Sequence, residues 1–189
     1  MSGIVIRPMA PGEAGAVSAL IRKVLLEVNS HDYPHDMIAA FAGSYTPEKV
    51  RAITAEGGHS YVADRDGEVV ACASIAPWDG AAGAAIVKAV YVHPALRGCG
   101  LGRAMLETLE GDPIFQSARK TVVSASITAH RFYAHMGYRY PTGARCWRRR
   151  TTTGWKSRDN PLVDNLGPSR YNDEKPHNSG IGRGLLAYG

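Results

Sequence analysis

The sequence predicts a mixed α/β fold built on one twisted sheet of about seven strands, flanked by four or five helices. Short β-branched runs alternate with segments in which apolar residues recur at three- and four-residue spacing. A helical segment joins the fourth and fifth strand-like runs, so these two strands should lie parallel in the sheet.

The first part of the chain should contain one strand and three helices. Residues 4–7 form a short β-branched run that a proline ends. Residues 11–29 carry apolar side chains at helical spacing, with a proline near the start and an asparagine near the end, which indicates an amphipathic helix. Two shorter helices should follow at 37–41 and 46–56, the second opening with a threonine–proline pair typical of an N-cap.

The middle part should contain three strands. Residues 59–63 and 68–76 are strand-like runs joined by a short turn, and its Asp66-Gly67 pair is typical of a tight hairpin. Residues 84–92 form another run rich in β-branched residues, which we expect to be the fourth strand.

The last part should contain a strand, a helix and a hairpin after the helix that begins near residue 100. Residues 121–126 form a short strand-like run, and residues 129–136 a helical one. Gly137 ends that helix, because a residue without a Cβ suits a left-handed cap. The runs 138–140 and 145–150 should pair as a final hairpin.

The composition fits one soluble domain, residues 1–150, followed by a tail, residues 151–189. The tail is dominated by Gly, Pro, Asn, Asp, Ser and Arg, so it should bury too little apolar surface to offset its ordering entropy and should be flexible. The N-terminus lacks a signal-peptide pattern, and no apolar run reaches the roughly 18 residues of a membrane span. We therefore expect a cytoplasmic protein without membrane contact.

Cysteine and histidine give no sign of a metal site. The three cysteines form no Cys-x-x-Cys pair. His31 and His35 stand four residues apart, but Pro34 lies between them and no third ligand is near. We expect neither a bound metal nor a disulfide framework. The net charge of +5 could attract an anionic cofactor or a nucleic acid, and composition does not choose between them.

A glycine-rich loop follows the fourth strand and opens the next helix. Gly98, Gly100 and Gly102 alternate along it and leave backbone N–H groups free of side-chain cover. Such groups at a helix N-terminus, with the positive end of the helix dipole behind them, bind phosphate or pyrophosphate. A Walker A loop is excluded because the sequence has no Gly-Lys pair, and a dinucleotide fingerprint because its third glycine is missing.

Two motifs carry a family resemblance. The loop, Arg97-Gly98-Cys99-Gly100-Leu101-Gly102, follows a strand ending in Val-His-Pro and resembles the acetyl-CoA pyrophosphate loop of the GNAT acetyltransferase superfamily. Residues 124–138 resemble the family segment in which a Phe-Tyr pair, here Phe132-Tyr133, lies just before Gly-Tyr. The Ser-x-Thr-Ala step before that pair is similar to bacterial members. The resemblance covers residues 3–150.

The resemblance implies the GNAT fold, with a V-shaped splay between the fourth and fifth strands that receives acetyl-CoA as co-substrate. It implies that Tyr133 is the general acid for the departing thiolate, and that the thioester carbonyl lies near the backbone N–H of Tyr91 or Val92. Ser126 stands where many members have an asparagine that contacts the pantetheine arm. The implied cofactor-binding residues are Val90, Tyr91, Val92, Arg97, Gly98, Cys99, Gly100, Leu101, Gly102, Arg103 and Ser126.

The general base stays open. The strand at residues 84–92 carries no acid that could face an acceptor. The candidates, each more typical of a structural role when taken alone, are His31, Asp32, Tyr33, Asp79 and a water held by Ser124.

The expected function is transfer of an acetyl group from acetyl-CoA to a primary amine of a small molecule or peptide, by direct attack in a ternary complex. One alternative is a catalytically idle domain that senses acyl-CoA or binds a partner protein. A lesser one is an RNA-associated acetyltransferase using the arginines of residues 145–150, since nucleic acid is the less expected partner. The acceptor, the use of longer acyl-CoAs and a homodimeric state are left open.

Overall fold

The computed structural model describes residues 3–123, 125–139 and 147–149. Within them, one sheet has the strand order β1-β2-β3-β4-β5-β6. Only the β4–β5 pair is parallel among these strands, as predicted from the helical crossover. The strands are β1 (Ile4–Pro8), β2 (His59–Arg65), β3 (Glu68–Trp78), β4 (Ala84–Val92), β5 (Lys120–Val123) and β6 (Trp147–Arg149).

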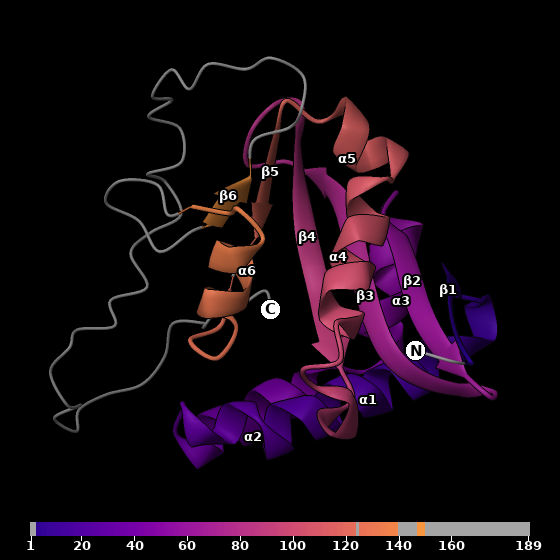
Figure 1. Cartoon of the computed structure of the whole chain (residues 1–189), viewed down its shortest axis with the longest axis vertical. Helices are drawn as coiled ribbons and strands as arrows, with labels where there is room; N and C mark the ends of the chain where they lie inside the picture. The colour runs from indigo at the N-terminus through magenta and orange to yellow at the C-terminus, as the bar shows by residue number, and fades with distance from the viewer. Residues whose placement is uncertain (1–2, 124, 140–146, 150–189) are drawn as a thin grey trace, which may run out of the picture.

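Helices cover both faces of this sheet (Figure 1). One face packs against the first three helices, and the other against α4, α5 and α6, so the sheet separates two apolar clusters. β3 lies between them and is buried along most of its length. The helices are α1 (Ala14–Glu27), α2 (His35–Ser44), α3 (Pro47–Ala55), α4 (Leu101–Glu110), α5 (Pro113–Ser117) and α6 (His130–His135), with 3₁₀ turns at Pro11–Glu13, Asn29–His31 and Pro94–Leu96.

Local signals in the sequence fix several boundaries. The side chain of Thr46 accepts a hydrogen bond from the Lys49 amide at 3.3 Å, which confirms the predicted N-cap of α3. Asp66 and Gly67 both have positive φ, 54° and 87°, as a two-residue hairpin turn requires, and the predicted β2–β3 hairpin is confirmed. Gly137 ends α6 with φ at 84°, the left-handed cap expected there.

A bulge redirects β4 just before the site. Cys72 pairs with Tyr91 and Ser74 with Lys88, so Ala73 faces the two residues Ala89 and Val90. Ala89 has a positive φ of 53°, which is rare for a residue with a side chain. Tyr91 consequently packs with α1 and α2, whereas Val90 and Val92 contact the cluster on the α4 side.

The splay expected beside β4 is present. β5 pairs with β4 only from Ala84 to Val87 and ends at Val123. β4 runs on to Val92, so its last residues have no paired strand on the β5 side within the described part of the chain. The fold therefore leaves an open backbone edge beside the N-terminus of α4.

Other predictions differ from the structure or fall outside the described residues. α2 is longer than the predicted 37–41 segment, and α5 was not expected, although Asp112 accepts the Ile114 amide at 2.7 Å as a regular N-cap before a proline. The described sheet has six strands rather than about seven. Residues 140–146, which include parts of the last hairpin, and the tail at 151–189 lie outside the described residues.

The described helices include none with the length and apolar character needed to cross a membrane.

Candidate functional site

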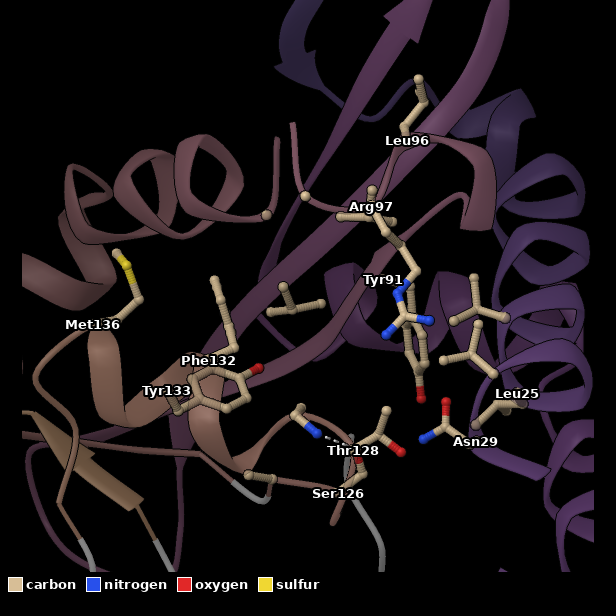
Figure 2. Close-up of a pocket in the computed structure, with 18 of the residues that line it drawn as sticks. Leu25, Asn29, Tyr91, Leu96, Arg97, Ser126, Thr128, Phe132, Tyr133 and Met136 are labelled. Carbon is tan, nitrogen blue, oxygen red and sulfur yellow. Dashed lines mark hydrogen bonds between the residues drawn. The ribbon is translucent and has the colours of Figure 1, made fainter. Parts of the chain in front are cut away.

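The candidate site is a cavity where the end of β4, the N-terminus of α4, α6 and the first two helices meet. Its volume is about 470 Å³. Figure 2 shows Tyr91 and Arg97 on one side of it, Phe132 and Tyr133 on another, and Leu25 with Asn29 on the helix wall. Of the residues implied by the family resemblance, the cavity brings together Val90, Tyr91, Val92, Arg97, Gly98, Gly100, Gly102, Arg103, Ser126 and Tyr133.

The loop before α4 presents unpaired backbone amides. The first hydrogen bond of this helix runs from the Ala104 amide to the Gly100 carbonyl, at 3.1 Å. The amides of residues 98–103 donate to no other described group. Gly98 and Gly100 have positive φ, 79° and 85°, and a Cβ at either position would meet no atom within 4 Å. The glycines therefore hold a turn that other residues adopt with strain, and they keep one side of it open.

Two arginines stand beside these amides. Arg97 and Arg103 line the cavity and are exposed, and neither forms an ion pair within the described part of the chain. Their charges add to the positive end of α4, so this corner suits an anion with several oxygens.

Two loop side chains point elsewhere. The Cys99 thiol donates to the Leu96 carbonyl at 2.9 Å, and Leu101 is 1% exposed within the core under α4. Neither residue lines the cavity. Cys99 and Leu101 were both predicted to bind the cofactor. At these two positions the backbone amides are placed to reach an anion, and the side chains are not.

The open edge of β4 is formed by alternate residues. The His93 amide donates to the Val70 carbonyl on the β3 side, at 2.8 Å. Because successive residues of a strand direct their N–H groups to opposite edges, Val92 directs its N–H toward the splay, and Tyr91 directs its own toward β3. Of the two candidates for a donor to the thioester carbonyl, the geometry favours Val92.

Tyr133 reaches the cavity from α6. Tyr133 is 4% exposed. The centroid of its ring lies 5.1 Å from that of Phe132 and 5.6 Å from that of Tyr138. Figure 2 shows its hydroxyl directed toward the middle of the cavity, and no described residue forms a hydrogen bond with it. Burial raises the pKa of Tyr133 well above that of a free phenol. The group is therefore a phenol, not a phenolate, at neutral pH.

The floor of the cavity is tied to the first helices by two long-range contacts. The Tyr33 hydroxyl accepts from the Ile127 amide at 2.9 Å, and the Thr128 hydroxyl donates to Asp32 at 2.5 Å. The nearby Ser126 hydroxyl accepts from the Ala129 amide at 3.2 Å and keeps its own proton available to a ligand. These contacts hold the segment after α1 against the loop before α6.

The candidates for a general base do not gather at the site. Asp32 and His31 are exposed, and Asp32 is engaged by Thr128. Asp79 is exposed at the far end of β4, and Ser124 lies outside the described residues. Tyr33 lines the cavity, but its hydroxyl already accepts a hydrogen bond. Among the described lining residues, none carries a carboxylate.

The helix wall of the cavity is not predicted from the sequence. Apolar residues of α1 and α2 form it together with Asn29 in the turn after α1. The signal was their spacing, since Val24 and Val28 lie one helical turn apart, but the same spacing marks core residues. The apolar members are Val24, Leu25, Val28, Met37, Ile38 and Phe41.

Within the described residues, no group of three or more His, Cys, Asp and Glu side chains is close enough to hold a metal ion.

Comparison with known families agrees with the two motifs. Residues 56–140 match the family described as "Acetyltransferase (GNAT) domain", which confirms the predicted resemblance. No curated protein matches the chain.

Solved structures share the fold at low sequence identity. PaiA N-acetyltransferase from Thermoplasma acidophilum, in complex with coenzyme A, has a TM-score of 0.68 and 14% identity over 79% of this chain and 99% of that one. A GCN5-related N-acetyltransferase from Rhodopseudomonas palustris has a TM-score of 0.64 and 22% identity, covering 79% and 97%. A GNAT family acetyltransferase from Brucella melitensis, in complex with acetyl-CoA, has a TM-score of 0.57 and 21% identity over 85% of this chain and 98% of that one.

Proposed function

Because residues 56–140 match the GNAT acetyltransferase domain family, we propose that the chain transfers the acetyl group of acetyl-CoA to a primary amine. The acceptor is a small molecule or peptide, and the amine attacks directly in a ternary complex. The observation that carries this proposal is the row of unpaired amides at residues 98–103, next to the open edge of β4. Two proteins of the same fold were crystallised with coenzyme A or acetyl-CoA, which supports this choice of donor.

The residues present fit the parts of acetyl-CoA. The amides of residues 98–103, with Arg97 and Arg103, suit the pyrophosphate. The open edge of β4 at Val90 and Val92 can pair with the amides of the pantetheine arm, as an added strand would. The Ser126 hydroxyl lines the same cavity and can donate to that arm.

Acetyl-CoA supplies an activated acetyl group as a thioester. In the transfer, the amine nitrogen bonds to the acetyl carbon as the carbon–sulfur bond breaks. The Val92 amide stabilises the charge on the carbonyl oxygen, and Tyr133 gives its proton to the leaving sulfur. Burial raises the pKa of Tyr133, so the phenol carries its proton when acetyl-CoA binds. The amine releases its proton to water or to the His135 imidazole, since the described lining residues include this histidine and no carboxylate.

The test is a pair of measurements on the purified chain. Acetyl-CoA at about 100 times its Kd should stabilise the protein by about 2.7 kcal/mol, seen as a rise in Tm. Release of free thiol from acetyl-CoA should then depend on added amine. A protein that binds acetyl-CoA but releases no thiol with any amine would be an acyl-CoA-binding domain. A protein whose Tm does not respond to acetyl-CoA would contradict the proposal entirely.

A further inference from the structure

The acceptor end of the cavity is the part lined by Asn29 and the apolar residues of α1 and α2. No charged side chain is found there among the described residues. α1 contributes Val24, Leu25 and Val28, and α2 contributes Met37, Ile38 and Phe41. Aliphatic and aromatic groups of this kind bind apolar surface and offer no partner to an ion.

One polar group interrupts this apolar wall. Asn29 is 7% exposed and lines the cavity, yet its side-chain amide makes no hydrogen bond to any described residue. Figure 2 shows that amide turned toward the cavity. The amide atoms of Asn29 are not among the fully buried polar atoms without a partner, so water in the cavity can reach them. A ligand that displaces this water loses binding free energy unless it pairs with the amide. The amide can both donate and accept, and it prefers an uncharged partner.

Among the described lining residues, the permanently charged side chains are two arginines, and His135 carries the one imidazole. Arg97 and Arg103 stand beside the helix N-terminus, where the pyrophosphate is proposed to bind. An acceptor with a second ammonium group would lose its hydration at the apolar end and find no carboxylate among the described lining residues. The cavity therefore disfavours polycations.

From these observations we infer the class of acceptor, an inference that rests on the proposed function. The acceptor is a primary amine with a branched aliphatic or aromatic body and one uncharged hydrogen-bonding group, such as a carboxamide, which pairs with Asn29. An α-amine fits well, because its pKa of about 8 leaves about a tenth of it neutral near pH 7, whereas a lysine-like amine is neutral less than about one time in a thousand. A site without a carboxylate base benefits from an amine that is already partly neutral.

The experiment measures thiol release from acetyl-CoA by the purified full-length chain, with the rate in the absence of amine subtracted. The amines are L-leucinamide, L-phenylalaninamide, isoamylamine, L-lysinamide and spermidine. Isoamylamine keeps the branched apolar body and lacks the carboxamide, and lysinamide keeps the carboxamide and adds a charge. We expect kcat/KM for leucinamide or phenylalaninamide to exceed that for lysinamide and spermidine by at least about 100-fold, because burying an unpaired ammonium is strongly unfavourable.

A variant tests the role of Asn29. Asn29→Leu keeps a similar volume and removes the amide, so the ratio of kcat/KM for leucinamide to that for isoamylamine should fall about tenfold. A merely structural role would lower both rates and leave the ratio unchanged. Ser30→Ala is the matched control, since Ser30 lies in the same turn, bonds the Leu26 carbonyl and does not line the cavity. In this variant the ratio should stay that of the wild type.

The outcomes separate the two proposals. If acetyl-CoA raises the Tm and lysinamide or spermidine reacts as fast as leucinamide, the acceptor class is wrong and the acetyltransferase proposal stands. An unchanged ratio in Asn29→Leu likewise overturns the assignment of Asn29. If acetyl-CoA neither raises the Tm nor releases thiol with any amine, the proposed function itself fails.

Discussion

Replacing Gly102 by alanine should separate the stability of the fold from the binding of acetyl-CoA. Gly102 lies in the first turn of α4 and has no positive φ. A Cβ there would lie 3.6 Å from the Phe132 ring and 3.7 Å from Val92, which are ordinary contact distances. Alanine is better than glycine inside a helix by about 0.5–1 kcal/mol. The free Gly102→Ala protein should therefore be no less stable than the wild type, and its Tm should rise by up to about 4 °C.

Binding should change in the opposite direction. The new methyl group would stand on the cavity wall next to the amides of residues 98–103, where the proposed pyrophosphate lies. A hydrogen bond to a charged group contributes about 1.5–3 kcal/mol, so displacing one such contact weakens acetyl-CoA binding by roughly 10- to 100-fold.

The assay is calorimetric titration with acetyl-CoA, together with thermal melts of the free protein. Gly15→Ala is the matched control. Gly15 is an exposed helical glycine of α1 with no atom within 4 Å of the added Cβ, so this variant should gain similar stability and bind acetyl-CoA as the wild type does. If Gly102→Ala binds acetyl-CoA with wild-type affinity, the placement of the pyrophosphate beside Gly102 is refuted.

Three further predictions follow from the same geometry. In steady-state assays, Tyr133→Phe should lower kcat by about 100-fold or more, because general acid catalysis is lost, while acetyl-CoA still binds. The control is Tyr138→Phe, which removes a neighbouring buried hydroxyl that has no described partner. This variant should keep the kcat of the wild type. Burial raises the pKa of both phenols above the unfolded value of about 10, so the folded state holds these protons more tightly than the unfolded state does. Thermal melts at different pH values test this. These two groups should not affect the Tm below about pH 10, and they should lower it above that pH. A double-mutant cycle of Asp32→Ala and Thr128→Val should give a coupling of about 0.5–1.5 kcal/mol in urea unfolding, and additive effects would show that this tie is not formed in solution.

Much of the fold could be predicted because its signals are local. The Asp66-Gly67 turn, the N-cap at Thr46 and the cap at Gly137 each depend on a residue type at one position, and all three are where the sequence placed them. The parallel β4–β5 pair followed from the length of the crossover alone. α5 could have been expected too, since Asp112 before a proline is the same kind of signal as the threonine–proline pair before α3.

The bulge in β4 could not be predicted in this way. Ala89 carries no mark of a positive φ, and its conformation depends on pairing with β3, a contact between distant residues. Yet the bulge decides which side chains face α1 and which face α4. From the sequence alone, Tyr91 and Val92 are therefore equal candidates for the amide donor. The hydrogen bond from the His93 amide to the Val70 carbonyl favours Val92.

The candidate site also has one part that local sequence predicts and another part that only the fold brings together. The anion-binding loop is a continuous stretch, so its glycines and Arg97 could be recognised from spacing. The acceptor end is assembled from α1, α2 and the turn at Asn29, whose apolar residues look like any buried helix face until the fold leaves a cavity against them. The proposed role of Asn29 depends on a further fact, namely that its side-chain amide lines the cavity and has no hydrogen-bond partner among the described residues.

The central claim is that the amides of residues 98–103 bind the pyrophosphate of acetyl-CoA. Amide hydrogen exchange with and without acetyl-CoA tests it most directly, because these groups have no partner among the described residues. Their exchange should slow by roughly tenfold or more when acetyl-CoA binds, and so should that of Val92, while the Asp66 amide in the hairpin turn should exchange at an unchanged rate. Saturating binding of acetyl-CoA with unchanged exchange at residues 98–103 would contradict the account.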